Sequence, residues 1–583
     1  MKKEVVHVCK NTKKTIVLIY EIAGIKLSLA VLLAILTGII PVIALWLNQG
    51  IINRIQAHDE SFSLIIARIV VLFVITITGT AISSFYQYIL NDIQNRMSYG
   101  INHKIMDKSS KLSLEDFERN ETYDQINRLE QNVTIKPYQT LQAIIEFVIS
   151  LFTISSASII IARQNVFVLL LILIVSIFLA ACEIKIGKKE YQIHYDRSEA
   201  ERKAWYMSYL LTHDTCFKEI KTNGIRNHFL YKYKKYVDMF IKQENAISRL
   251  RGILLFLVSF AQDLISGMLM VIITIKAYRG EVLLGTAITF LSTVSLVQRS
   301  TNNCAQQVYS LHNASIYLNT FFEFLSLDEE KSGNKEVKVL ENIKLRNVEF
   351  DYIGKKEAVK QIDLEIKKGD QIAIVGRNGS GKSTLFKILS GLYIPKGEFY
   401  VNGIERNRID NDSYRMCISA MFQDFLKYEG TLKDNILIGD IRKECENVEI
   451  VKALKSANVD FLITDDEYEL SQNIGSWFKN GKQLSGGQWQ KIALARAYYK
   501  NAEMYMLDEP SAALDVIAEK RIFETFFNRS KGKIGIFITH RVKIAQLAPR
   551  ILVMDGGRII AEGTHDLLYR NCNLYKEMYD EED

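Results

Sequence analysis

The chain has 583 residues, enough for two or more domains, and it carries 73 Lys and Arg against 66 Asp and Glu, a net charge of +7. This modest excess fits cytoplasmic loops beside anionic lipid headgroups and does not indicate a nucleic-acid-binding protein. The seven cysteines (9, 182, 216, 304, 417, 445 and 572) have no C-x-x-C spacing. We therefore expect reduced thiols, and neither a disulfide framework nor a metal site.

Long apolar runs fill the first half of the chain. Four of them lack Asp, Glu, Lys and Arg, and two carry one acid each, Glu146 and Asp263. A helix needs about 20 mostly apolar residues to cross a bilayer, and a soluble core does not need six such runs. We therefore predict six membrane-spanning helices. Their approximate bounds are residues 25–49, 66–91, 138–162, 164–182, 252–276 and 281–299.

The charges around these runs predict their orientation. Lysines gather near the start of the chain, at positions 2, 3, 10, 13 and 14. Such a cluster favours a cytoplasmic N-terminus, and six spans then return the C-terminal part to the cytoplasm. Two long, charged connections, Asp92–Lys136 and Glu183–Arg251, fall on the same side, and their sequences indicate helices. We expect a multi-pass protein of the plasma or inner membrane, with both termini cytoplasmic.

One acid lies in the middle of a predicted span. A carboxylate at the bilayer centre is costly, so Asp263, beside Gln262, is not expected to face lipid. One hypothesis is that Asp263 and Gln262 line a substrate cavity and attract a cationic group. The alternative is that Asp263 braces two helices. Glu146 lies closer to the cytoplasmic end of its span, and no role follows for it.

A phosphate-binding loop opens the chemistry of the C-terminal half. An apolar run at residues 371–375 predicts a buried strand, and a helix follows the loop. The pattern G-x-x-x-x-G-K-[ST] turns backbone N–H groups toward an anion at a helix N-terminus. Lys382 is expected to reach the β- and γ-phosphates of ATP, and Ser383 to ligate Mg²⁺. The predicted ATP-binding residues are Gly376, Arg377, Asn378, Gly379, Ser380, Gly381, Lys382, Ser383 and Thr384.

Two adjacent acids follow a second apolar strand, at residues 503–507. Asp508 suits the Mg²⁺ shell, as a Walker B aspartate does. Glu509 is placed to polarise the attacking water as a general base. A solvated turn is the usual explanation for such a pair, and the upstream phosphate loop argues against it here.

The segment Leu484-Ser485-Gly486-Gly487-Gln488 resembles the signature of ATP-binding-cassette (ABC) proteins, and the other motifs of that family follow its order. Tyr352 matches the aromatic residue that stacks on adenine. Gln423 matches the glutamine that senses Mg²⁺, and His540 matches the switch histidine at the γ-phosphate. Residues 511–515 match the D-loop. The resemblance implies catalytic roles for Glu509, His540 and Gln423, a metal site of Ser383, Gln423 and Asp508, and ATP and Mg²⁺ as cofactors.

The resemblance also implies a dimer. In this family the signature turn, here Ser485, Gly486, Gly487 and Gln488, caps the γ-phosphate held by the opposite subunit. One chain holds one phosphate loop and one signature, so each ATP requires two chains. Because the motifs of this chain are intact, a homodimer is the first expectation, and a heterodimer with a related chain remains the alternative.

The fold implied is a membrane all-α, six-helix ABC exporter transmembrane domain followed by an α/β P-loop NTPase, the ABC cassette. We place the transmembrane domain at residues 1–326, a linker at 327–339 and the cassette at 340–583. Two short coupling helices are expected near Leu114–Gln125 and Thr212–Thr222.

A subfamily hint precedes the signature. The pattern Gly475-x-Trp477-Phe478-x-x-Gly481, followed by the signature and Trp489, resembles exporters of lantibiotics and related bacteriocin peptides. The alternative is that these aromatic residues pack under the coupling surface. Since the first span begins near residue 25, we expect neither an N-terminal peptidase domain nor a cleavable secretory signal.

Three readings of function follow. The first is a primary active exporter that moves a bacteriocin-type peptide by alternating access. The second keeps this architecture and moves a lipid, a lipid-linked glycan or a drug. The third is an ABC-type gated channel or regulator, and the intact Glu509 argues against it because gating alone does not need fast hydrolysis.

Overall fold

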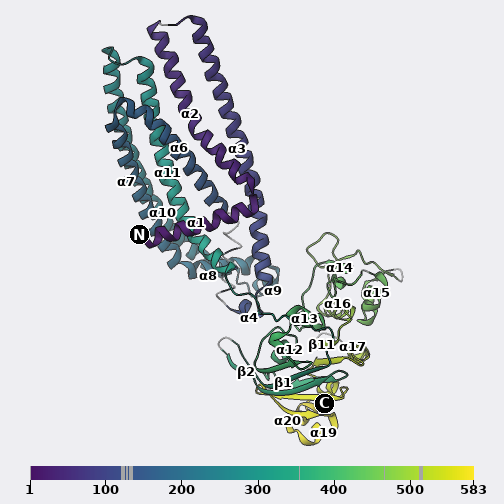
Figure 1. The fold of residues 1–583 in the computed structure, drawn as a ribbon. Helices are drawn as coiled ribbons and strands as arrows, with labels where there is room; N and C mark the ends of the chain where they lie inside the picture. The colour runs from purple at the N-terminus through teal and green to yellow at the C-terminus, as the bar shows by residue number, and fades with distance from the viewer. Residues whose placement is uncertain are drawn as a thin grey trace. The chain divides into compact units, whose positions relative to one another are not determined.

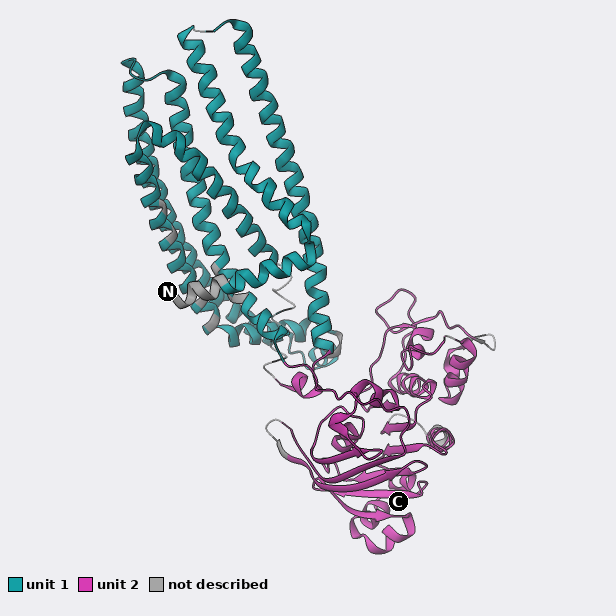
Figure 2. Ribbon diagram, viewed as in Figure 1, with its two compact units in different colours: residues 1–110, 121–327 teal, residues 111–120, 328–583 magenta. Residues whose placement is uncertain are grey.

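The computed structural model describes residues 2–58, 60–119, 122, 125–126, 129, 136–352, 355–444, 446–464, 467–510 and 516–582. The chain forms two compact units (Figure 2). Unit 1 comprises Met1–Ser110 and Glu121–Leu327, and unit 2 comprises Lys111–Asn120 and Asp328–Asp583.

In the described part of unit 1, all secondary-structure elements are helices (Figure 1). Its long helices run side by side (Figure 1). Gly24, with φ 57°, separates the first two helices of the chain. The helices are α1 (Lys2–Ala23), α2 (Ile25–Ala57), α3 (Phe62–Ser110), α6 (Lys136–Gln164), α7 (Val166–Asp196), α8 (Ser198–Thr212), α9 (Asp214–Thr222), α10 (Arg226–Tyr278) and α11 (Leu284–Leu325).

Among the described residues, five helices are long and apolar enough to cross a membrane: α2, α3, α6, α7 and α10. The sixth predicted span falls on α11, whose uncharged part is short and ends before Arg299. The helices α3 and α10 have 49 and 53 residues. At 1.5 Å per residue they are about 74 and 80 Å long, well beyond the ~30 Å of a hydrocarbon core. They therefore continue into the connections that the sequence predicted to be charged helices.

Polar side chains hold α10 against α11 inside this apolar unit. Gln262 and Asn302 exchange two amide hydrogen bonds of 3.0 Å each. One turn away, the Gln298 amide donates to Ser266 Oγ at 3.0 Å. Buried amides surrounded by apolar groups must be satisfied, so these pairs fix the register of the two helices.

A close backbone approach joins α2 to α6. Thr153 Oγ1 donates to the carbonyl oxygen of Gly38 at 2.9 Å. A Cβ added at Gly38 would lie 2.7 Å from the carbonyl oxygen of Ile149. Only glycine allows the two helices to pack at this distance, as small residues generally do between membrane helices.

Unit 2 contains a four-stranded sheet in the order β2-β1-β4-β5 and a six-stranded sheet in the order β14-β13-β3-β12-β11-β6. The strands of the first sheet are β1 (Asn342–Tyr352), β2 (Lys355–Lys367), β4 (Lys396–Val401) and β5 (Ile404–Glu405). Those of the second are β3 (Gln371–Gly376), β6 (Ile418–Met421), β11 (Met504–Asp508), β12 (Ile534–Ile538), β13 (Arg550–Asp555) and β14 (Arg558–Gly563). Two short pairs complete the strands: β7 (Gly430–Thr431) with β10 (Asn473–Ile474), and β8 (Ile463–Thr464) with β9 (Glu467–Tyr468).

Helices accompany these sheets. They are α4 (Leu114–Glu118), α12 (Lys382–Leu389), α13 (Asn411–Met416), α14 (Leu432–Leu437), α15 (Asn447–Ser456), α16 (Gly486–Tyr499), α17 (Val516–Arg529), α18 (Val542–Ala545), α19 (His565–Asn571) and α20 (Asn573–Asp580), with 3₁₀ turns at Arg406–Arg408 and Asp460–Leu462.

The central strands are apolar on both faces, as expected of a covered parallel sheet. Alternate residues enter two different hydrophobic cores. Ile372 and Ile374 of β3 join the core that contains α12, whereas Ala373 and Val375 join the core that contains α16. The helices α12 and α16 therefore lie against opposite faces of the same sheet.

From Asp328 on, the segment predicted as a linker is part of unit 2. Arg415 forms an ion pair with Glu330, and Lys335 bridges to Ile409. The boundary between the two units falls after Leu327. Five of the predicted thiols, at 182, 216, 304, 417 and 572, form no disulfide in the part of the chain that the structure describes.

Replacing Gly38 with valine tests the packing of α2 on α6. The added side chain would collide with the backbone of α6, and such overpacking costs about 1–3 kcal/mol. We expect a lower unfolding temperature for the detergent-solubilised protein. The control is Gly50→Val in the same helix, where no atom of the described residues lies within 4 Å of an added Cβ. Equal unfolding temperatures for the two variants would contradict the close approach.

Candidate functional site

Four neighbouring parallel strands, in the order β3-β12-β11-β6, end at one edge of the six-stranded sheet. Each delivers a segment that the sequence singled out. β3 leads into the phosphate loop, and β12 leads to His540. β11 ends at Asp508, followed by Glu509, and β6 leads to Gln423. The carboxyl edge of a parallel sheet is where ligands of α/β proteins bind.

The phosphate loop runs from Gly376 to Ser383 and enters α12. Gly379 and Gly381 have φ values of 79° and 100°, which only glycine adopts without strain. Lys382 is 5% exposed, and its ammonium donates to the carbonyl oxygens of Gly376 and Arg377 at 2.8 and 3.0 Å. Burial lowers its pKa, and the nearby Glu509 and Asp508 charges raise it in part. The lysine is thus a desolvated cation held at the mouth of the loop.

Asp508 is a buried acid beside this cation. Desolvation, together with the Glu509 charge, raises its pKa to about 6, while Lys382 and a hydrogen bond from Ser383 act in the opposite direction. Its Oδ1 atom accepts no hydrogen bond from the residues that the structure describes. An unsatisfied carboxylate oxygen next to a serine hydroxyl is a donor set suited to a divalent cation.

Both carboxylate oxygens of Glu509 have a partner. Its Oε2 accepts a hydrogen bond from Gln423 Nε2 at 3.0 Å, and its Oε1 lies 2.6 Å from His540 Nε2. Its backbone is in the left-handed region, with φ 49°. The structure therefore brings together the three residues that the sequence predicted to be catalytic.

Gln490, on α16, is a neighbour of Glu509 that the sequence analysis missed. Its Nε2 donates to the Glu509 carbonyl oxygen at 3.0 Å. The side chain is 5% exposed, and Ile538 accepts a hydrogen bond from the Glu509 N–H at 3.1 Å. These two bonds fix the strained backbone of Glu509 from both sides. The only sequence signal was an amide side chain two residues after the signature.

Tyr352 lies beside the helix that follows the phosphate loop. Its hydroxyl is 3.1 Å from Thr384 Oγ1, and its ring makes edge contacts with Phe350 and Tyr393 at centroid distances of 5.3 and 5.7 Å. The aromatic residue predicted to stack on adenine thus stands near the start of α12.

The signature turn caps a helix. Ser485 is the N-cap of α16, and it forms a capping box with Gln488, whose side chain accepts from the Ser485 N–H at 2.8 Å. Gly486 and Gly487 form the first turn of the helix. Since α16 and α12 lie on opposite faces of the sheet, this turn does not close over the phosphate loop of its own chain.

Some predicted features fall outside this cluster. The D-loop, residues 511–515, lies outside the described residues. The ranges predicted for the coupling helices contain α4 and α9. α4 is itself part of unit 2, where Glu118 Oε1 accepts a 2.5 Å hydrogen bond from Tyr393 Oη.

The aromatic pair before the signature is exposed. Trp477 and Phe478 are 82% and 53% exposed, so neither is buried inside the cassette. Glu429 Oε2 holds the turn by accepting from the N–H groups of Ser476 and Trp477 at 2.7 and 2.6 Å. Trp489, in contrast, is buried in the core around α16.

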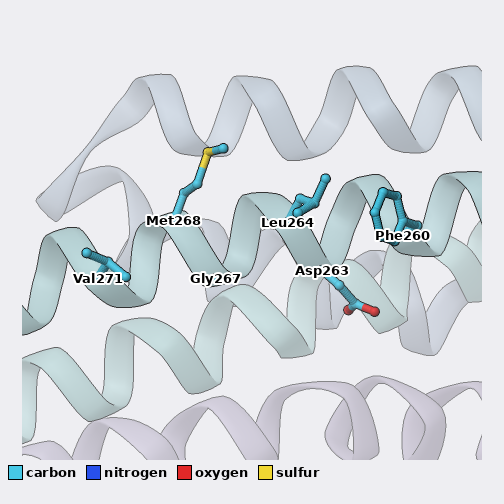
Figure 3. Close-up of a pocket in the computed structure, with 6 residues that line it drawn as sticks. All are labelled: Phe260, Asp263, Leu264, Gly267, Met268 and Val271. Atoms are coloured by element: carbon cyan, nitrogen blue, oxygen red, sulfur yellow. The ribbon is translucent and has the colours of Figure 1, made fainter.

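The two residues predicted to line a substrate cavity, Gln262 and Asp263, have different surroundings. Gln262 is buried in its amide pair with Asn302. Asp263 lines an open hollow of about 380 Å³ whose lining comes from α10 alone, and its carboxylate projects away from Met268 and Leu264 (Figure 3). The bracing role falls to Gln262, and Asp263 forms no ion pair with the described residues.

Comparisons with known proteins agree with this geometry. Residues 359–512 match the family described as ABC transporter. The chain is 40% identical over its whole length to the subtilin transport ATP-binding protein SpaT of Bacillus subtilis, covering 95% of that protein. The chain belongs to the ABC transporter family. It is also 35% identical to the nisin transport ATP-binding protein NisT of Lactococcus lactis subsp. lactis, covering 99% of this chain and 97% of that protein.

An ATP-dependent lipid A-core flippase of Neisseria gonorrhoeae is 35% identical, but over 45% of this chain and 44% of that protein. Among solved structures, a bacterial Atm1-family ABC exporter with ATP bound superposes with a TM-score of 0.80 at 20% identity, covering 97% of this chain and 98% of that one. The chain is therefore an ABC half-transporter with an exporter fold, in which a helical unit precedes a nucleotide-binding cassette. It is an ATP hydrolase coupled to transport across a membrane.

The Gln490 contact generates a prediction. Gln490→Leu keeps the volume and removes the hydrogen bond to the Glu509 carbonyl, which contributes about 1 kcal/mol to the position of that backbone. We expect kcat for ATP hydrolysis to fall about five-fold while KM for ATP stays near its original value. Lys491→Ala is the matched control, because this neighbouring side chain makes no polar contact with the described residues. Equal rates of ATP hydrolysis for the two variants would contradict a role of Gln490 in positioning Glu509.

Proposed function

We propose that this protein is a homodimeric exporter that uses Mg·ATP hydrolysis to move a peptide of the lantibiotic or bacteriocin type out of the cytoplasm. The observation that carries the cargo class is coverage. The subtilin and nisin transport proteins match along nearly the whole chain, including the helical unit, whereas the flippase matches over less than half of it. Cargo contacts belong to the helical unit, so similarity there weighs more than similarity of cassettes.

Nucleotide binding is assigned to the residues at the carboxyl edge of the sheet. The Tyr352 ring stacks on adenine, the N–H groups of the phosphate loop surround the phosphates, and Lys382 pairs with the β- and γ-phosphates. The divalent-cation site is assigned to Ser383, Gln423 and Asp508. Its support is the buried Asp508 Oδ1, which accepts no hydrogen bond from any described residue, and the raised pKa of that carboxyl, both of which a cation would relieve. Bound Mg²⁺ supplies charge neutralisation on the phosphate oxygens.

Hydrolysis is assigned to Glu509 as general base. Gln423 and His540 hold its two carboxylate oxygens from either side, which orients the carboxylate toward the edge where the phosphate loop ends. A water molecule between Glu509 and the γ-phosphate would lose its proton to this carboxylate as it attacks. His540 would in addition contact the γ-phosphate.

A second copy completes each site. The helices that follow the signature turn and the phosphate loop, α16 and α12, pack on opposite faces of one sheet. Ser485, Gly486, Gly487 and Gln488 are therefore assigned to ATP held by the partner. ATP then joins two cassettes, and hydrolysis removes the contact that joins them. The helices α4 and α9 are assigned to carry this closure to the membrane spans, which alternate between openings to the two sides. Both termini and the cassette are placed in the cytoplasm.

The ATPase rate of the purified chain in lipid nanodiscs tests this proposal. We expect lantibiotic precursor peptides to stimulate hydrolysis by the lone chain, and Glu509→Gln to abolish the rate while retaining ATP. Stimulation by lipid or drug, with no response to any peptide, would overturn the cargo class. Hydrolysis that appears only after a related chain is added would replace the homodimer with a heterodimer.

A further inference from the structure

A second hollow in unit 1, of about 540 Å³, has a different chemistry from the one beside Asp263. Three helices form it, and the lining residues of each helix recur at spacings of three or four positions and therefore lie on one face of that helix. α2 gives positions 41, 44, 45 and 48, α3 gives 72 and 76, and α11 gives 292, 296 and 299. Its volume is that of a ligand site and holds several side chains of a bound molecule.

Arg299 is the charged residue of this hollow, whose lining is otherwise neutral. It makes no ion pair within the part of the chain that the structure describes. Other arginines near the same helices are paired: Arg54 and Arg68 both bind Glu60 at the connection between α2 and α3. No acid lines the hollow, so its cation has no internal counter-charge among the described residues.

The depth of Arg299 makes an unpaired charge costly. It lies fifteen residues after the start of α11 at Leu284, which is about 22 Å along the helix. Asn48 lies nine residues before the end of α2 at Ala57, about 14 Å from that end. Ionisable residues at such depths in membrane proteins face cavities and serve substrate or ion pathways.

The remaining lining favours an anion with apolar neighbours. Asn48 and Ser292 add hydrogen-bond donors beside the Arg299 guanidinium, whereas Leu45, Leu72 and Leu296 supply apolar surface. Near the C-terminal end of α2, hydrogen bonds hold α2 against α11. Gln49 and Asn53 both donate to Thr286 Oγ1, at 3.0 and 2.9 Å. The hollow thus adjoins, along both helices, a polar contact that joins α2 to α11.

We infer that this hollow binds a carboxylate of the transported peptide, through Arg299, with apolar side chains next to that carboxylate seated on the three leucines. The inference rests on the proposed function and adds the charge class of the cargo. It places the recognition of charge on α11 at Arg299, and not on α10 at Asp263.

The test uses two synthetic twelve-residue peptides, one alternating Leu with Glu and the other alternating Leu with Gln, added to the full chain in phosphatidylcholine nanodiscs. Binding is measured by fluorescence anisotropy and stimulation by ATPase rate. We expect the Glu peptide to bind the original chain at least about ten-fold more tightly than the Gln peptide, as a charged hydrogen-bonded pair requires. Arg299→Gln should abolish this preference, and Arg299→Lys should keep most of it. Arg299→Glu should reverse it toward a peptide that alternates Leu with Lys.

Asp263→Asn is the matched control, since it changes a charge in the other hollow, and it should leave the preference unchanged. The size-exclusion profile and the unfolding temperature in detergent report the folding of each variant, and both should match those of the original chain.

Three results would overturn the inference. Peptides that stimulate regardless of their charge would overturn it alone and leave the proposed function standing. No binding of any of these peptides and no stimulation by precursor peptides would overturn both. A signal that depends on Arg299 but appears with phosphatidylglycerol in the nanodisc and no peptide would assign the site to a lipid phosphate.

Discussion

The chemistry of this protein depends on one geometric constraint: the carboxyl ends of β3, β12, β11 and β6 meet at the same edge of a sheet. Strand pairing fixes the register, with Asp508 opposite Ile538 and Ile538 opposite Ile374. The phosphate loop, His540, the two acids and Gln423 are therefore brought together by backbone hydrogen bonds and not by flexible loops. Side chains positioned in this way lose little entropy when substrate binds, which is what preorganised catalysis requires.

The same sheet separates the two motifs that a nucleotide must touch. Alternate side chains of its strands belong to two hydrophobic cores, and the helices α12 and α16 pack on opposite faces of the sheet. One chain can thus present a phosphate loop or a signature to a given ATP, but not both. Association of two cassettes becomes the step that binding energy drives, and helices of 49 and 53 residues are long enough to carry that step from the cytoplasm through a bilayer.

The sequence was most informative where chemistry follows chain order. Glycines of the phosphate loop, the acid pair after a strand and the serine of the signature have local reasons for their positions, so their segments could be predicted without a structure. Contacts between distant segments could not. The amide of Gln490 reaches Glu509 because α16 and β11 pack in one hydrophobic core. Gln262 pairs with Asn302 because α10 and α11 pack in one register. Arg299 ended an uncharged run and was interpreted as the end of a span, whereas it lines a hollow between three helices.

The central claim is that hydrolysis at this sheet edge drives a peptide out of the cytoplasm. Inside-out membrane vesicles containing only this chain, mixed with a labelled lantibiotic precursor, test it most directly. The account predicts that labelled peptide accumulates inside the vesicles against its concentration gradient when ATP is supplied, and that a non-hydrolysable ATP analogue does not support accumulation. Equal peptide levels with and without ATP, in vesicles whose ATPase is active, would contradict it.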